Sequence, residues 1–395
     1  MKLLKHLLSV LTVFALAVNV VSLDTSASIR ISEVPAKRTV NSVQTKYFDN
    51  IDSVTEYVRD NMTKRISPIE FSVPSELDGR ETVLNILRNA TSVETEDSHQ
   101  GDYLRKSLNY VEYSIGTYDD KIEISLNADY TTTAEQEKLV DEKIAEILRT
   151  LDISGKNDYK KISAVYEYII NNVTYDNVSD NDLKYTAYGA LYNGTAVCQG
   201  IAMLFYRMAR EAGISCRIIV GEAGSPHAWN IAEIDGIYYL LDPTFDLYFS
   251  KIPDCKYFML GTEDFDDYNK KITHIPASAE MGLSSLDFDY ESESFQKEYP
   301  ISSKKFAVEN KAGDINSDGY TDAVDASMIL AEYAELSTNG KSSFTTVQEI
   351  IADVNDDDEI NAVDASMLLQ YYAYISTTPA DEHINPEDFF KKEVI

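Results

Sequence analysis

The stretch HAWNIAEIDGIYYLLDP, residues 227–243, predicts a β-hairpin that pairs a histidine with an aspartate. Two runs of strand-forming residues flank Asp235-Gly236, which is a typical two-residue hairpin turn. A tight turn sets the register and puts Asp242 opposite Trp229. Because strand side chains alternate between faces, His227 shares the face of Trp229. Asp242 is then the diagonal neighbour of His227, within reach of a side-chain hydrogen bond.

Upstream of the hairpin, Cys198 is predicted at the N-terminus of a helix. A turn over 194–197 precedes it, and apolar residues at helical spacing follow as far as Gly213. The helix dipole and free N–H groups at that end favour an anion, so they favour the thiolate. Cysteine, histidine and aspartate each have a common structural explanation alone, but their order and predicted geometry favour a nucleophile, a base and an orienting acid.

The remaining cysteines and histidines give weaker signals. Three cysteines are a poor number for a disulfide framework. Cys216 opens an apolar strand and is expected in the core. Cys255 has no predicted place, and neither His274 nor His99 has a predicted partner.

Four segments within about 160–275 resemble the transglutaminase-like superfamily, whose core is similar to papain-type cysteine proteases. The resemblance implies an α+β papain-like fold in which Cys198 is the nucleophile, His227 the base and Asp242 the orienting residue. Gln199 follows the cysteine, whereas eukaryotic-type transglutaminases carry Gln before it; this favours peptidase or amidase chemistry over cross-linking and leaves the second oxyanion donor unnamed. The matching segments are AYGAL (187–191), VCQG (197–200), HAWN (227–230) and LDPT (241–244).

Two acidic loops near the C-terminus, 39 residues apart, predict two calcium sites. Each presents oxygen ligands at loop positions 1, 3, 5, 7, 9 and 12 and runs into nearly the same helix. The second loop has Asp358 where the first has the turn residue Gly319, so the second site is the less certain one. The predicted ligands are Asp314, Asn316, Asp318, the Tyr320 carbonyl, Asp322 and Asp325, then Asp353, Asn355, Asp357, the Glu359 carbonyl, Asn361 and Asp364.

This duplicated loop–helix unit resembles a type I dockerin of cellulosome-forming bacteria. The resemblance implies an all-α, EF-hand-like module that holds two structural calcium ions and binds a cohesin module of a scaffoldin. Two docking orientations are expected, because both copies are alike. The partner-recognition positions of the family fall on Ala323, Val324, Ala362 and Val363.

The net charge and the N-terminal sequence limit the classes of binding partner and the cellular location that we expect. The 395 residues have a formal charge of −31, which excludes nucleic acid and anionic membrane surfaces as main partners. A positive start and a short apolar run predict a signal peptide, hence a secreted, extracellular protein without membrane insertion, cellulosome-bound at the cell surface. The expected parts are a signal peptide (1–28), an N-terminal α+β region of unknown role (29–129), a transglutaminase-like core (130–290), a linker (291–311), the dockerin (312–376) and a C-terminal tail (377–395).

Three functions remain open from the sequence. The first is a cysteine hydrolase of protein or peptide substrates, acting through a thioester, in a complex that degrades plant polysaccharide. The second is a transglutaminase or deamidase acting on glutamine. The third is a non-catalytic binding module whose sure activity is cohesin binding. A glycoside hydrolase site is not supported. Such a site needs a specific pair of carboxylates, and in a chain with 66 Asp and Glu residues pairs of acidic residues are too common to indicate one.

Overall fold

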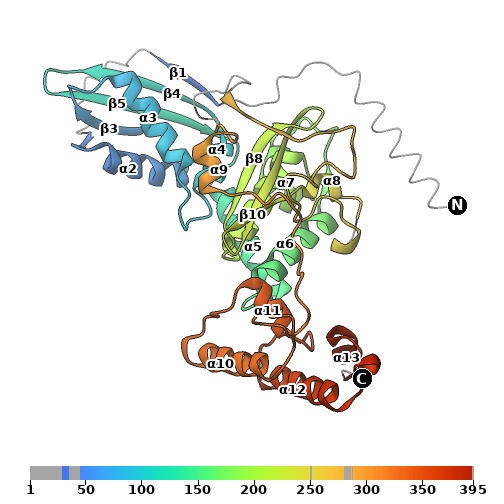
Figure 1. Cartoon of the computed structure of the whole chain (residues 1–395). Coiled ribbons are helices and arrows are strands. Elements are labelled where there is room, and N and C mark those ends of the chain that lie inside the picture. The colour runs from blue at the N-terminus through green and yellow to red at the C-terminus, as the bar shows by residue number, and fades with distance from the viewer. Residues whose placement is uncertain (1–28, 35–44, 250, 280–285, 287, 394–395) are drawn as a thin grey trace.

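Three parts follow one another along the chain in the computed structural model, which describes residues 29–34, 45–249, 251–279, 286 and 288–393. Figure 1 shows a sheet-containing part in blue and cyan, a central part in green and yellow, and a helical part in red. The mixture of strands and helices is α+β, as predicted. The predicted signal peptide, 1–28, lies outside the described residues.

The first part is a sheet with strand order β1-β4-β5-β3-β2 and its own apolar core. Side chains of β5 alternate between buried and half-exposed, which gives the sheet one core face. Buried apolar residues of three helices, α2, α3 and α4, pack in the same core. The elements are β1 (Arg30–Glu33), β2 (Lys46–Tyr47), α2 (Ile51–Thr63), β3 (Ile69–Pro74), α3 (Gly79–Ser92), α4 (Gly101–Lys106), β4 (Leu108–Thr117) and β5 (Lys121–Tyr130).

The central part is built around α7 (Cys198–Glu211), of which ten consecutive residues are buried. It packs against a sheet of order β10-β9-β8-β11 and against two longer helices. Thr133 and Gln136 form a capping box that starts the first of these helices. The remaining elements are α5 (Ala134–Leu151), α6 (Asp158–Asn172), β6 (Thr174–Tyr175), β7 (Thr195–Ala196), β8 (Cys216–Glu222), β9 (Pro226–Ile234), β10 (Ile237–Leu241), α8 (Pro243–Asp246) and β11 (Ile275–Pro276).

The hairpin of β9 and β10 has the predicted register. Ile234 pairs with Ile237, and Leu241 pairs with Asn230. Both turn residues have positive φ, 53° for Asp235 and 82° for Gly236, which is the geometry of a two-residue hairpin turn. The register confirms the position expected for Asp242, one residue past the end of β10.

Most of the stretch expected to be a linker, 291–311, packs on the central part. Helix α9 (Glu293–Glu298) buries Phe295, Ile301 forms a bridge to Tyr238, and Phe306 stacks on Tyr159. Apolar side chains hold this segment on the sheet and on α6, and no periodic pattern in the sequence indicates that packing.

The last part consists of α10 (Ala323–Asn339), α11 (Thr346–Ala352), α12 (Ala362–Thr377) and α13 (Pro386–Glu393). Helices α10 and α12 follow the two acidic loops, as predicted. The tail from 377, which had no clear sequence pattern, also packs: Phe390 is buried against Tyr371, and Glu387 accepts a hydrogen bond from the Ala312 amide.

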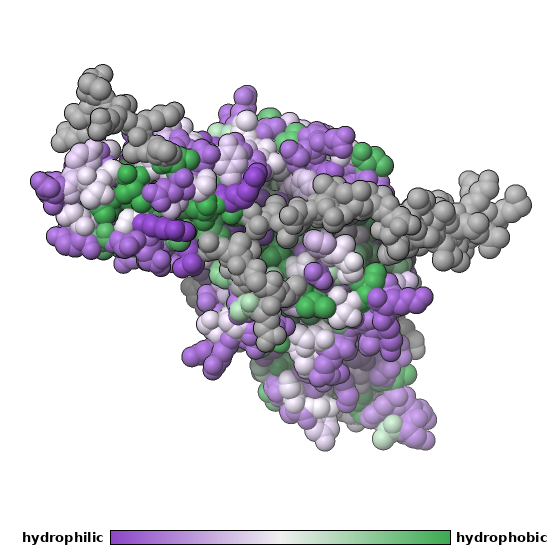
Figure 2. All heavy atoms as spheres, turned by 90° about the horizontal axis from the view of Figure 1, so that it is seen from above, coloured by the Kyte–Doolittle hydropathy of each residue, from purple (hydrophilic) through white to green (hydrophobic). Residues whose placement is uncertain are grey.

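The visible surface is largely hydrophilic. On the face seen in Figure 2, hydrophilic residues dominate and hydrophobic residues form small separate patches. Among the described residues, every helix is too short or too polar to cross a membrane.

Candidate functional site

The predicted His227–Asp242 pair is formed. The Nε2 atom of His227 lies 2.6 Å from Oδ2 of Asp242, and His227 also shares a hydrogen bond with the Cys198 thiol. The imidazole lies between Phe245 and Trp229, with ring centroids 4.9 and 6.0 Å away. These rings fix the plane of the imidazole. The contacts of His227 with Asp242 and Cys198 bring all three predicted residues together.

The charges of His227 and Asp242 stabilise each other. Burial disfavours the protonated form of His227, but Asp242 and Cys198 outweigh burial and raise the pKa of His227 to about 10. Burial likewise disfavours the carboxylate of Asp242, but His227 and His274 hold the pKa of Asp242 well below its ordinary value. The site therefore favours an imidazolium at His227 beside the ionised Asp242 carboxylate.

Cys198 is the first residue of α7, and its thiol is half-buried. Gly200 lets this helix start lie close to the preceding segment, since a Cβ there would come within 2.5 Å of the Lys184 carbonyl oxygen. The phenol of Tyr175 lies beside Cys198, and burial together with the charge of Cys198 raises the pKa of Tyr175. Cys216 is buried, as expected, and Cys255 is half-buried.

His274 belongs to this site, which sequence reasoning missed. Its Nε2 lies 3.1 Å from Oδ2 of Asp242, and its Nδ1 lies 2.7 Å from Oδ1 of Asp266. A single histidine 32 residues from Asp242 carries no local signal of this contact. Gly221, opposite His227 in the β8–β9 ladder, permits it: a Cβ there would come within 2.0 Å of the Ile275 carbonyl oxygen.

The two acidic loops have matching internal hydrogen bonds. In the first, Asp314 accepts from the amides of Asp318 and Gly319, and the buried Asp325 accepts from Ile315 and Asp322. In the second, Asp353 accepts from Asp357 and Asp358, and the buried Asp364 accepts from Val354 and Asn361. The loops thus gather oxygen ligands in one pattern, which fits the hard-cation chemistry expected for calcium.

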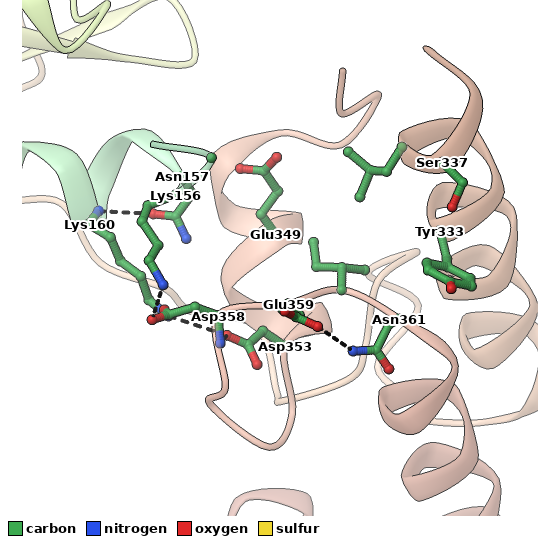
Figure 3. A pocket seen from close by; sticks show the side chains of 13 residues that line it. Lys156, Asn157, Lys160, Tyr333, Ser337, Glu349, Asp353, Asp358, Glu359 and Asn361 are labelled. Carbon is green, nitrogen blue, oxygen red and sulfur yellow. Dashed lines mark hydrogen bonds and ion pairs between the residues drawn. The ribbon is translucent and has the colours of Figure 1, made fainter. Parts of the chain in front are cut away.

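Of the two acidic loops, only the second contacts lysines of the central part, among the described residues. Nζ of Lys160 lies 3.2 Å from Oδ2 of Asp353 and also bonds Asp358, while Nζ of Lys156 lies 2.5 Å from Asp358. These groups line a pocket of about 330 Å3, in which Figure 3 shows both lysines pointing to Asp358. Asp358 has a φ of 66°, a conformation that the equivalent Gly319 adopts at lower cost.

Both long helices of the last part present the same exposed apolar positions. Val324, Leu330 and Tyr333 of α10 recur as Val363, Leu369 and Tyr372 of α12, and all six are exposed. The predicted recognition residues Ala323 and Ala362 are exposed beside them. Two equivalent surfaces result, which is the symmetry expected from the repeat.

Comparisons with known proteins agree with this organisation. Residues 145–243 match the model of the transglutaminase-like superfamily, and residues 312–373 match that of the dockerin type I domain. The human kyphoscoliosis peptidase is 24% identical over 165 residues, which is 38% of this chain and 23% of that protein.

Two solved structures are similar at low identity. One is the crystal structure of a TGase, with 16% identity, a TM-score of 0.25 and coverage of 51% of this chain and 59% of that one. The other is a candidate cysteine protease from Cytophaga hutchinsonii, with 19% identity, a TM-score of 0.22 and coverage of 34% and 62%. The chain spans less than two thirds of each of these proteins and of the human relative. It joins a transglutaminase-like domain at 145–243 to a C-terminal type I dockerin domain at 312–373.

Proposed function

We propose that this chain is a cysteine hydrolase of peptide or amide bonds, tethered to a cohesin through its dockerin. The Cys198 thiolate attacks the carbonyl carbon, His227 gives its proton to the leaving amine as the C–N bond breaks, and water then hydrolyses the thioester. Asp242 holds the imidazole in the required orientation throughout. The observation that carries the proposal is the His227 ring, bonded to Asp242 at 2.6 Å and also to the thiol.

Hydrolysis is favoured over transfer to an amine by two considerations. Val197 precedes the cysteine in place of glutamine, and the similar human protein is named a peptidase. Transfer or deamidation at glutamine would use the same thioester and differ only in the acceptor. Incubation of a glutamine-rich protein with a labelled primary amine separates the two reactions, because incorporation of the amine would contradict the hydrolase proposal.

The first test is the rate of iodoacetamide labelling of each cysteine in the folded, calcium-loaded chain, read by mass spectrometry of peptides. Cys198 is expected to label fast below pH 8, at least about tenfold faster than Cys216 and Cys255. His227→Ala should abolish this advantage. Equal labelling of all three cysteines in the wild type would contradict the proposed nucleophile.

The dockerin is proposed to bind a cohesin module of a scaffoldin in a calcium-dependent way. Exposed apolar residues repeated on α10 and α12 support a contact through Ala323, Val324, Ala362 and Val363. Titration with a panel of recombinant cohesins, in calcium and in EGTA, tests this tether. Val324→Asp together with Val363→Asp should abolish binding, whereas either change alone leaves one face intact and should reduce it little.

Calcium would be held in each loop by the predicted oxygen ligands and would supply structural cross-linking there. Secretion and a cellulosome-bound location follow from the proposed tether and signal peptide. Detection of the mature chain in a purified extracellular scaffoldin complex, with its N-terminus near residue 28, tests both.

A further inference from the structure

His274 is a buried histidine that bonds two carboxylates. Its Nε2 faces Asp242 at 3.1 Å, its Nδ1 faces Asp266 at 2.7 Å, and its side chain is 2% exposed. The backbone amide of His274 also donates to Asp266, at 3.0 Å. One residue thus ties the aspartate of the catalytic triad to a second aspartate 24 residues further along the chain.

The donor and acceptor roles follow from chemistry. An ionised carboxylate only accepts hydrogen bonds, so Nε2 of His274 donates in its hydrogen bond to the Asp242 carboxylate. Asp242 then receives His274 and His227 on the same oxygen, Oδ2. Its Oδ1 receives the amides of Thr244 and Phe245, at 2.9 and 3.3 Å.

The surroundings leave few other charges near the ring. Among the described residues, the titratable side chains in contact with His274 are Asp242, Asp266, His227 and Tyr257. Trp229, Phe245 and Phe265 enclose it otherwise. In this dry environment a charged hydrogen bond is stronger than in water, and losing one is correspondingly costly.

A metal ion held by His227, Asp242 and His274 is a second arrangement that these residues allow, because their ligand atoms lie within 4.8 Å of one another. The hydrogen-bonded arrangement accounts for more of the geometry. It uses both nitrogens of His274, and it explains Asp266, which lies outside that group of three.

We infer that His274 is a positioning residue for the nucleophile: anchored by Asp266, it holds the Asp242 carboxylate toward His227 and so sustains the Cys198 thiolate. The inference rests on the proposed function. It assigns to the reaction a Cys198–His227–Asp242–His274–Asp266 chain, longer than the three residues that the sequence predicts.

Two variants of His274 separate hydrogen bonding from packing. The amide nitrogen of Gln reaches about where Nε2 lies, so His274→Gln keeps a donor toward Asp242. The amide nitrogen of Asn reaches only where Nδ1 lies, so His274→Asn keeps the contact with Asp266 and loses the one with Asp242. His99 provides a matched control, because it lies outside the site between Asp97 at 2.7 Å and Asp141 at 2.8 Å.

The measurement is the alkylation rate of Cys198 by iodoacetamide against pH, on folded, calcium-loaded full-length chains whose melting temperatures are recorded. His274→Asn is expected to slow labelling at pH 7 on the order of tenfold and to move the pH midpoint upward. His274→Gln should stay within about twofold of the wild type, as should His99→Asn and His99→Gln.

Each other outcome has a distinct meaning. If both His274 variants label like the wild type, or if both are folded and equally slow, the positioning role is overturned and the histidine is a packing residue. If wild-type Cys198 labels no faster than Cys216 and Cys255, the proposed nucleophile fails and this inference fails with it.

Discussion

Four donors surround the two oxygens of Asp242: the rings of His227 and His274 and the amides of Thr244 and Phe245. The carboxylate is fully buried and also caps the short helix α8. Its structural and chemical roles therefore involve different oxygens, since the cap uses Oδ1 and the histidines use Oδ2. This separation makes a selective substitution possible.

Asp242→Asn should impair the site with little loss of the cap. The Asn oxygen can still accept from Thr244 and Phe245. Its NH2 group then faces Nε2 of His227, which donates to Asp242 in the wild type, and two donors repel each other. We expect Cys198 alkylation at pH 7 to fall at least about tenfold, with the melting temperature nearly unchanged. Asp242→Ala, which removes the cap as well, should lower both. Wild-type labelling by Asp242→Asn would contradict the role of the carboxylate.

The charge of His227 should also be visible in the stability of the fold. Its pKa is about 10 in the folded chain against 6.5 ordinarily, so the folded state binds the proton more tightly. The resulting stabilisation is complete below pH 6.5 and is lost as pH rises to about 10. Urea unfolding of the wild type and His227→Gln between pH 6 and 10 should show their difference shrinking across this window; a constant difference would contradict the coupling.

At the scale of elements, a buried ion cluster joins α4 to β8. Asp102 accepts from Nε of Arg217 at 2.8 Å, from the Ile218 amide at 2.8 Å and from Arg105 at 2.5 Å. Burial disfavours its carboxylate, but Arg217 and Arg105 outweigh burial and lower the pKa of Asp102 to about 2. The contact fixes α4, which precedes β4 of the first sheet, against β8 of the central sheet.

Removing the charge of Asp102 should therefore destabilise the chain. Asp102→Asn removes the anion of the buried Arg105 guanidinium and leaves Arg217 with Glu94 alone, and we expect a loss of about 3–5 kcal/mol in the free energy of unfolding. The exposed Asp60→Asn is the control and should change it by no more than about 0.5 kcal/mol. Because the pKa is lowered, the contribution of Asp102 is present above pH 3.8 and is lost as pH falls through about 2. Equal urea midpoints for the two variants at pH 7 would refute this.

The elements that the sequence could predict are those with local signals. The apolar period after Cys198 and the Asp235-Gly236 turn each determine a boundary or a register within a few residues. The contacts that it could not predict join distant positions through single polar side chains, such as Asp102 with Arg217 and His274 with Asp242. A single charged residue forms no periodic pattern in the sequence, so only the folded structure shows which residue it pairs with.

At the scale of the whole molecule, the second acidic loop is both a predicted cation site and a contact with the central part. Lys160 approaches Asp353, a predicted ligand, and Asp358, which stands in place of the turn glycine. Burial and the neighbouring Asp353 and Asp357 raise the pKa of Asp364 in that loop to about 6. Calcium entering this loop must compete with an ammonium group, whereas the described residues of the first loop contact no lysine of the central part.

Lys160→Met should therefore tighten calcium binding at the second loop. For a partly exposed ion pair worth about 1 kcal/mol, the expected gain is roughly fivefold in affinity, measured by calorimetric titration of the full chain. Lys161→Met is the matched control, since Lys161 pairs only with Asp158 on its own helix among the ion pairs of the described residues. Equal affinities for both variants and the wild type would contradict the competition.

The contact of Lys156 and Lys160 with the second loop affects how the chain is oriented on a scaffold. Two loop–helix copies that differ little in sequence would allow the isolated module to rotate by half a turn and offer nearly the same face. Among the described residues, Lys156 and Lys160 contact the second loop and not the first, so the two copies have different surroundings within the chain, although the apolar residues of both helices stay exposed. A scaffold bound through α10 and one bound through α12 would therefore hold the central part in two different orientations.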